Sequence, residues 1–302
     1  QVNDDLLSKI AEGDGPAAEF ALSVIEGKKA GKWRKTWVDT FLRERDSSGR
    51  CHANINPLQA RTARMSITGI PAQTLPAGDW MIRRCFVADP GQLIASVDYQ
   101  AQELRVLAAL SGDPTMIQAF KDGADLHQLT ADAAGVDRKV GKMANFLKVY
   151  GGGAAKLAAS AGITFHAAKS VIDGFDRTYP EVQQLSSRLQ REATQTGCIF
   201  TPTGRRLPVD EDRAYSALNY LIQSTSRDVT GRALIRLHEA GFTPYLRLPI
   251  HDEVLCSLPE DKAQWGSQRI AELMADRMGD VAITTDAEVG GRSWGSLYGA
   301  DY

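Results

Sequence analysis

The sequence has few of the features that mark zinc-binding, secreted or membrane proteins. Its four cysteines, Cys51, Cys85, Cys198 and Cys256, lie far apart and form no Cys-x-x-Cys pair. This spacing argues against zinc and gives no reason to expect disulfide bonds, so a reducing compartment is favoured. The chain has no uninterrupted apolar run of about 18 residues, and its N-terminus carries no signal pattern. We therefore expect a cytoplasmic protein without a membrane partner.

The sequence also lacks an excess of charge of one sign. Its formal net charge is −2 over 302 residues. No global positive field indicates nucleic-acid binding, so any such binding must come from local clusters. Apolar residues make up 43% of the chain, which is enough to bury a large core and more than one lobe. Because residue 1 is glutamine rather than methionine, we expect a fragment or a processed product.

The spacing of apolar residues predicts groups of helices separated by short strands. Residues 4–44 are expected to be helical, and residues 45–80 to form loops with short strands. Further helices are expected over 102–110, 115–121, 125–134, 138–150, 154–160, 165–178, 180–196, 211–240 and 260–278. Strands are expected over Met81–Val87, Leu93–Val97, a hairpin at 198–210, 243–249, 253–258 and a short C-terminal segment. This order favours an α+β fold with one all-helical insertion.

Acidic residues occur at the end of one apolar run and within another. Leu93–Val97 leads into Asp98, and a second run contains Asp252 and Glu253. An unpaired charge in apolar surroundings is costly, so two such runs suggest carboxylates gathered around divalent metal ions. Two ions roughly 3.5–4 Å apart would activate an attacking hydroxyl and stabilise a leaving pyrophosphate. The alternative is a solvated turn Asp and an unrelated Asp at a strand end.

Arg138, Lys142, Phe146 and Tyr150 follow one another at intervals of four residues within an expected helix. They therefore form a stripe on one face of that helix. Two cations followed by two aromatic rings fit a triphosphate at one end and a base or sugar at the other. The alternative is an amphipathic helix with an aromatic core face and solvated cations.

Two smaller clusters point to DNA. Asn219 and Gln223 lie one helical turn apart, and amides on one face can read the minor-groove acceptors that all base pairs share. A polar helix face explains them equally well. Basic residues that fit phosphate contacts, or that are ordinary surface charge, are Arg61, Arg64, Arg83, Arg84, Arg205, Arg206 and the cations between 28 and 35.

Taken together, these clusters resemble a known family. The segment Asp98–Ala108, followed by Ser111-Gly112-Asp113, resembles the first polymerase motif of family A DNA polymerases, the bacterial polymerase I type. Arg138–Gly151 resembles the fingers-helix motif of that family, and residues 251–253, His-Asp-Glu, resemble its third motif. The order and spacing of the motifs agree, and the resemblance covers nearly the whole chain. Divergent positions and compact loops suggest a bacteriophage enzyme.

The resemblance implies a right-hand polymerase fold. An antiparallel-sheet palm would comprise residues 45–112 and 198–302, with an inserted all-helical fingers subdomain at 113–197. Residues 1–44 would be the end of the thumb and its return to the palm, and the thumb would be largely absent. The chain would then be a C-terminal part of a longer or split enzyme.

The resemblance also implies roles for individual residues. Asp98 and Asp252 would bind two Mg²⁺ ions, or Mn²⁺ in their place, with the Tyr99 carbonyl as a further ligand and Glu253 as a supporting carboxylate. The residues implied to hold or shape the incoming deoxynucleotide are Tyr99, Glu103, His127, Arg138, Lys142, Phe146 and Tyr150. Among them Glu103 would be the steric gate beneath the sugar 2′ position, and Lys142 would also donate a proton to pyrophosphate. The residues expected to contact DNA are Arg64, Arg205, Asn219, Gln223 and His251.

The implied function is template-directed DNA synthesis from deoxynucleotides (dNTPs) on primer-template DNA by a monomeric catalytic unit, with any processivity factor unknown. One alternative is a single-subunit RNA polymerase, against which Glu103 and the pair Phe146 and Tyr150 argue. Another is a catalytically silent DNA-binding module. The sequence departs from the family pattern at Gln100-Ala101, Leu147-Lys148 and Tyr215.

Overall fold

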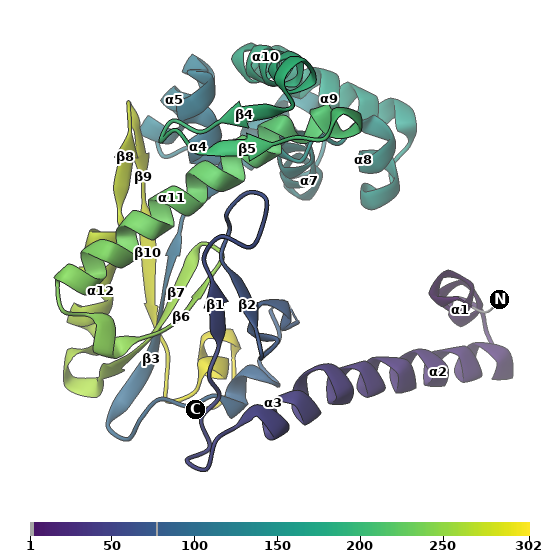
Figure 1. The fold of residues 1–302 in the computed structure, drawn as a ribbon. Coiled ribbons are helices and arrows are strands. Elements are labelled where there is room, and N and C mark those ends of the chain that lie inside the picture. Colours follow the sequence, from purple (N-terminus) through teal and green to yellow (C-terminus); the bar gives the residue numbers. More distant parts are fainter. Residues whose placement is uncertain (1–2, 77) are drawn as a thin grey trace. The chain divides into compact units, whose positions relative to one another are not determined.

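A computed structural model describes residues 3–76 and 78–302 as two compact units (Figure 1). The first unit comprises Gln1–Asn56, Ser66–Val87 and Gly291–Tyr302. The second comprises Pro57–Met65 and Ala88–Gly290. Within the described parts of the chain, none of the helices is long and apolar enough to cross a membrane.

The first unit begins with the helices that the sequence predicts. These are α1 (Asp4–Ala11), α2 (Pro16–Trp33), a π-helical segment (Arg34–Val38) and α3 (Asp39–Glu44). The short strands β1 (Asn54–Asn56) and β2 (Ser66–Thr68) pair antiparallel. Aromatic rings join distant segments of this unit: the ring centroids of Phe41 and Phe86 lie 4.8 Å apart, and those of Phe86 and Trp294 lie 6.0 Å apart.

The strand expected over Met81–Val87 is wrong, because this segment forms a 3-10 turn at Arg83–Cys85. Arg83 is only 8% exposed, and its Nη1 donates to the carbonyls of Pro76 (2.6 Å) and Asp79 (2.7 Å). Its guanidinium also lies 5.1 Å from the ring centroid of Trp294. Burying a guanidinium requires this many partners, and a turn supplies the preceding carbonyls where an extended strand would not.

The second unit is built on a four-stranded antiparallel sheet in the order β10-β3-β7-β6 (Figure 1). Its strands are β3 (Gln92–Tyr99), β6 (Leu246–Ile250), β7 (Glu253–Pro259) and β10 (Thr285–Val289). Helix α12 (Ala263–Met274) packs against β3, β7 and β10. Ala95, Val97 and Tyr99 are buried, whereas Ser96 is partly exposed and Asp98 is exposed. Side chains alternate between the two faces of a strand, so Ser96 and Asp98 share the opposite face from that core set.

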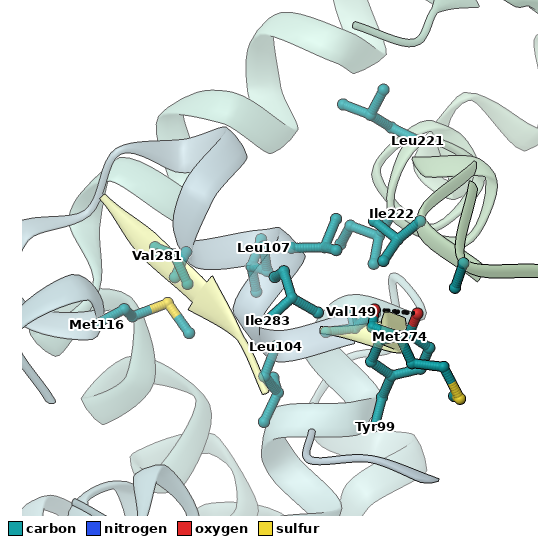
Figure 2. Close-up of a cluster of buried hydrophobic side chains, with 14 of the residues drawn as sticks. Tyr99, Leu104, Leu107, Met116, Val149, Leu221, Ile222, Met274, Val281 and Ile283 are labelled. Carbon is teal, nitrogen blue, oxygen red and sulfur yellow. Dashed lines mark hydrogen bonds between the residues drawn. The ribbon is translucent and has the colours of Figure 1, made fainter. Parts of the chain in front are cut away.

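The main core consists of buried side chains from this sheet and from the helices around it, and Figure 2 shows a cluster of them. Tyr99, Leu104, Leu107, Ile222 and Ile283 are each at most 2% exposed. The hydroxyl of Tyr99 donates to the carbonyl of Met274 at 2.9 Å, the dashed contact in Figure 2. Burial of a tyrosine needs such a partner for its hydroxyl. The bond ties the end of β3 to the end of α12.

Helices make up the part of the second unit between β3 and the second half of the sheet. They are α4 (Gln102–Ser111), α5 (Pro114–Lys121), α6 (Leu126–Ala134), α7 (Arg138–Val149), α8 (Ala154–Ala161), α9 (Phe165–Thr178) and α10 (Pro180–Thr196). All seven match the sequence prediction within one residue at each end. The expected hairpin follows as β4 (Cys198–Phe200) and β5 (Arg206–Pro208). The α+β prediction is thus confirmed.

Three predicted boundaries are wrong. The helix expected over 211–240 is a 3-10 segment at Glu211–Ser216 followed by α11 (Ala217–Glu239). Residues 243–245 are a 3-10 turn rather than strand. The helix expected over 260–278 starts with a 3-10 turn and ends at Met274, after which β8 (Asp276–Met278) and β9 (Val281–Ile283) form a hairpin.

The side chain of Arg236 on α11 binds the last carbonyls of α12, which ends at Met274. Arg236 donates from Nε to the carbonyl of Leu273 at 2.7 Å, and from Nη2 to the carbonyls of Met274 and Ala275 at 3.1 Å. The last carbonyls of a helix need partners from outside it. These contacts come from a helix some 40 residues earlier in the sequence, which local periodicity cannot reveal.

Helix α7 packs unusually closely on α6. A Cβ placed at Gly141 would lie 2.4 Å from the carbonyl oxygen of His127 and 3.0 Å from Ala131. Real side chains do not tolerate such distances, so a glycine is required there for the backbones to approach. The close packing fixes the first turn of α6, which carries His127, against the first turn of α7.

Candidate active site

Three carboxylates lie in one row across the sheet. Asp98 on β3 is directly opposite Glu253 on β7 and directly opposite Asp286 on β10. Directly opposite residues of antiparallel strands point to the same face, with their Cβ atoms about 5 Å apart. Like charges in such pairs destabilise the sheet, so this row favours a bound cation.

Asp252 joins the row from the turn between β6 and β7. The backbone N–H of Tyr99 donates to the carbonyl of Asp252 at 3.1 Å, which brings that turn against the end of β3. The residue before it, His251, has a φ of 58°, a left-handed conformation that is uncommon outside glycine. Such strain persists where the surroundings over-determine the backbone, and it is concentrated at functional sites.

Glu253 is held in place by a side chain from the neighbouring strand. The Oγ of Ser96 donates to Oε1 of Glu253 at 2.7 Å. Ser96 precedes Asp98 by two residues on β3 and therefore shares its face. The hydrogen bond fixes the Glu253 carboxylate beside the other acids.

The acidic row changes the protonation of Asp98. Loss of hydration, followed by the negative charges of Asp252 and Glu253, raises the pKa of Asp98 to about 7. Within residues 3–76 and 78–302, no three His, Cys, Asp or Glu side chains are gathered as a complete metal site. This donor set nevertheless fits Mg²⁺, which commonly takes one or two protein carboxylates and completes its shell with substrate phosphates and water. A divalent cation would offset the repulsion that raises the pKa of Asp98.

Glu103 connects three segments that are distant in sequence. It lies in the first turn of α4, and Arg64 forms an ion pair with its Oε1. The Oη of Tyr150, just after α7, donates to its Oε2 at 3.4 Å. Loss of hydration raises the pKa of Glu103, and the positive charge of Arg64 opposes that shift. The carboxylate is 11% exposed, so these two partners define its position.

The predicted stripe on α7 is present, and α6 adds residues to it. Lys142 lies with its Nζ 5.9 Å from the ring centroid of Phe146, and the ring of His127 lies 5.7 Å from that of Phe146. Asp125, which caps α6, pairs with Arg138 at 2.6 Å. These contacts bring two cations, an imidazole and an aromatic ring to one side of the α6–α7 pair.

His127 is oriented by a buried amide. The side chain of Asn145, which is 1% exposed, approaches Nδ1 of His127 at 3.0 Å. Asn145 is itself held by Thr130 at 2.8 Å. Burial lowers the pKa of His127, and the positive charges of Arg138 and Lys142 lower it further, whereas Asp125 raises it.

On α11, Asn219 of the predicted amide pair is buried and Gln223 is partly buried. Thr62 donates to Oε1 of Gln223 at 3.2 Å. Asn219 is 8% exposed, and its Nδ2 has no partner among the described residues. A buried amide donor without an acceptor costs free energy. An external acceptor would remove that cost.

Arg205 and His251 are the remaining residues predicted to contact DNA. The guanidinium of Arg205 is paired with Asp228 of α11, which is 8% exposed. His251 lines a small depression on the surface with Arg64 and Arg227.

The sequence analysis assigned no role to Asp286, Ser96, Asn145 or Arg227. Strand register places Asp286 beside Asp98, and no local pattern in the sequence encodes that register. Asn145 could have been suspected, because a polar residue that precedes an aromatic within an amphipathic helix is either solvated or specifically paired.

Comparisons with known proteins identify the family of the chain. The model of DNA polymerase family A matches residues 1–296. The chain belongs to DNA polymerase family A. Among family members, DNA polymerases of Mycobacterium phages D29 and L5 are 66% and 65% identical to it, over 97% and 100% of this chain and 49% and 50% of theirs. The thermostable DNA polymerase I of Thermus aquaticus is 30% identical, over 90% of this chain and 36% of that protein.

A solved structure of the same family shares the fold. The POL domain of Pol1 from M. smegmatis, described in complex with DNA primer-template and dNTP, superposes with a TM-score of 0.85. It is 27% identical in sequence, and the match covers 98% of this chain and 56% of that one. This likeness identifies the fold as that of a family A polymerase domain. The chain spans about half the length of the curated phage relatives.

Proposed function

We propose that this protein is a template-directed DNA polymerase that adds deoxynucleotides to a primer 3′-hydroxyl with release of pyrophosphate. The observation that carries the proposal is the convergence of Asp98 and Asp252 at the end of β3. Family membership and the likeness to a polymerase domain that binds primer-template and dNTP support it.

Asp98 and Asp252 would hold two divalent ions, with Glu253 beside them and the Tyr99 carbonyl as a further ligand. When bound, Mg²⁺ or Mn²⁺ would supply charge stabilisation for the attacking and leaving oxygens. The chain itself supplies a fixed acidic face: β3 and β7 position the carboxylates, and Ser96 orients Glu253.

The incoming nucleotide would lie along the α6–α7 face. Arg138, Lys142 and His127 would bind the triphosphate, because guanidinium and ammonium groups form strong charge-assisted hydrogen bonds to phosphate. Lys142 would also protonate the leaving pyrophosphate. Phe146 and Tyr150 would pack against the nucleotide.

Selection against ribonucleotides and contact with DNA would come from other residues. Glu103, fixed by Arg64 and Tyr150, would occupy the space that a 2′-hydroxyl needs. The residues proposed to contact DNA are Arg64, Arg205, Asn219, Gln223 and His251. We assign the fingers to residues 113–197, the palm to 45–112 and 198–302, and the end of the thumb to 1–44.

Primer extension tests the proposed function. The purified protein, given a primed template, MgCl₂ and either dNTPs or ribonucleotides, should extend the primer with dNTPs far faster. Preference for ribonucleotides would favour the RNA polymerase alternative. Tight binding of the primed template without extension in Mg²⁺ or Mn²⁺ would leave only a DNA-binding module.

Nucleotide binding should be accompanied by proton uptake at His127. In the free protein its pKa lies below the ordinary value of about 6.5, so the imidazole is neutral at pH 7. A bound triphosphate opposes the charges of Arg138 and Lys142 and should raise that pKa, so that protons are taken up near pH 6.5. Calorimetry of dNTP binding in buffers with different ionisation enthalpies measures the uptake.

The control is His127→Gln, which keeps a hydrogen-bonding side chain but cannot titrate. Equal proton uptake by this variant and the wild type would contradict the assignment.

The lowered pKa of His127 also affects the stability of the fold. Because the unfolded chain binds the proton more tightly, the stability tied to neutral His127 is present above pH of about 6.5 and is lost as pH falls below it.

A further inference from the structure

Two arginines share one buried carboxylate on α11. Oδ1 of Asp228 is paired with Nη2 of Arg205 and lies 3.5 Å from Nη1 of Arg227. Its Oδ2 accepts from Oγ1 of Thr203 at 2.6 Å. Among the described residues, the ion pairs of Arg205 and Arg227 are both formed with Asp228. The cluster therefore carries two positive charges and one negative charge, which leaves one positive charge uncompensated.

The position of Arg227 depends on a glycine in the middle of α11. A Cβ added to Gly231 would lie 3.0 Å from Nη1 and 3.6 Å from Cζ of Arg227. The guanidinium therefore lies along the helix, over a residue one turn further on. Glycine is unfavourable inside a helix compared with alanine. Gly231 therefore lowers the helix propensity of α11 but leaves the space that the Arg227 guanidinium occupies.

Arg227 also lies beside residues of the proposed site. It lines the same surface depression as Arg64 and His251, and His251 immediately precedes Asp252. The adjoining turn of α11 is fixed to the start of α4, because Nε2 of Gln102 donates to the carbonyl of Ser226 at 3.3 Å. Gln102 lies four residues after Asp98.

The stripe formed by Asn219 and Gln223 continues to Arg227, because the three residues are spaced four apart on α11. The first two are amides, which suit base edges in the minor groove. The third is a cation whose side chain is 19% exposed. A guanidinium in this position suits the phosphate backbone, which it can bind through two parallel hydrogen bonds.

We infer that Arg227 binds a phosphodiester of the primer strand next to the primer terminus, and that Asp228 is the residue that positions it. This inference rests on the proposed polymerase function. The uncompensated positive charge supplies the attraction, and the glycine and Asp228 hold the guanidinium in one orientation. Contacts of this kind set the register of DNA on a protein without reading its sequence.

The test compares Arg227→Ala with Arg232→Ala in binding a fluorescent primer-template by anisotropy. Arg232 lies on the same helix but pairs with Asp276 at 2.8 Å, so its variant removes the same charge elsewhere. Arg227→Ala should weaken binding about tenfold, and the slope of log K against log salt should fall by about 0.9. Arg232→Ala should leave both unchanged. Equal slopes for Arg227→Ala and the wild type would overturn the inference.

Two further arms identify the contact. Arg227→Lys keeps the charge but loses the planar fork, so it should retain the salt slope while binding more weakly than the wild type. Neutral methylphosphonates would replace the primer phosphates one at a time. One of these replacements should weaken DNA binding by the wild type, and the same replacement should not weaken binding by Arg227→Ala any further. Sensitivity that is confined to template phosphates, or is the same in both proteins, would refute the primer-strand contact.

The outcome separates this inference from the proposed function. Wild-type protein that extends primers but shows no change in salt slope on Arg227→Ala refutes the contact alone. Wild-type protein that binds primer-template with the predicted slope change, yet never extends it, refutes the polymerase function alone.

Discussion

Asp252→Asn should reduce primer extension by at least about a thousandfold, a loss of about 4 kcal/mol in transition-state stabilisation. Asparagine keeps the size of the side chain and can remain in the turn between β6 and β7. It removes one of the two charges proposed to hold the divalent ions, and a neutral amide is a much weaker ligand for Mg²⁺. Steady-state extension of a labelled primer measures the loss.

Thermal unfolding provides a second measurement that does not depend on activity. In the wild type, Mg²⁺ or Mn²⁺ should raise the melting temperature, because a ligand that binds only the folded state stabilises it. The shift should be much smaller in Asp252→Asn. Without added metal, the variant should be at least as stable as the wild type, because one of the charges that raises the pKa of Asp98 is gone.

The matched control for this variant is Asp280→Asn. Asp280 lies in the second unit and is largely exposed, and it pairs with Lys121 at 3.4 Å. An exposed ion pair of this kind contributes little, so extension and the metal-induced shift should match those of the wild type. Full activity of Asp252→Asn, or equal metal-induced shifts in both variants, would refute the assignment of Asp252.

Glu103→Ala should raise the incorporation of ribonucleotides relative to deoxynucleotides by about a hundredfold, within the range that one group in a tight pocket supplies. The wild-type carboxylate cannot move aside easily, because Arg64 and Tyr150 hold its two oxygens. Truncation to alanine opens the space for a 2′-hydroxyl. Competition between labelled dNTP and the matching ribonucleotide on one template measures the ratio.

Glu103→Gln separates shape from charge. Glutamine fills the same volume and can still accept from Tyr150, but it weakens the pairing with Arg64. If the gate acts by shape, this variant should keep most of the discrimination while extending more slowly. An unchanged ratio in Glu103→Ala would contradict the proposed gate.

Local sequence patterns located most of the helices. The i, i+4 spacing of Arg138, Lys142 and Phe146 predicted both α7 and the residues that share one of its faces. Helices α4 to α10 begin and end within one residue of the prediction because helix hydrogen bonds and caps are local. The Asp113 cap of α5 is an example, since its carboxylate accepts from the N–H of Met116 at 3.0 Å.

Errors occurred where distant residues decide the local conformation. The segment around Arg83 reads as an apolar strand, but the turn forms because that guanidinium is buried against Trp294 and Tyr298, more than 200 residues later. The last carbonyls of α12 are likewise bound by Arg236 on α11. In both cases the partner that satisfies a buried group lies far along the chain.

The same distinction holds within the candidate site. The residue types and spacings around Asp98, Arg138 and Asp252 were sufficient to suggest family A, because the motifs of the family are short local segments. The pairing of Glu103 with Arg64, 39 residues away, could not be foreseen. Neither could the alignment of Asp286 with Asp98 or the sharing of Asp228 by two arginines.

By itself, then, the sequence determined most of the helices, the apolar strands that carry acids and the motifs typical of the family, because each depends on residues within a few positions of one another. The tertiary structure alone decided which charges face each other. Strand register and helix packing bring together groups separated by 23 to more than 150 residues. The free energy of such contacts comes from burial and pairing in three dimensions, and the order of neighbouring residues in the sequence does not reveal them.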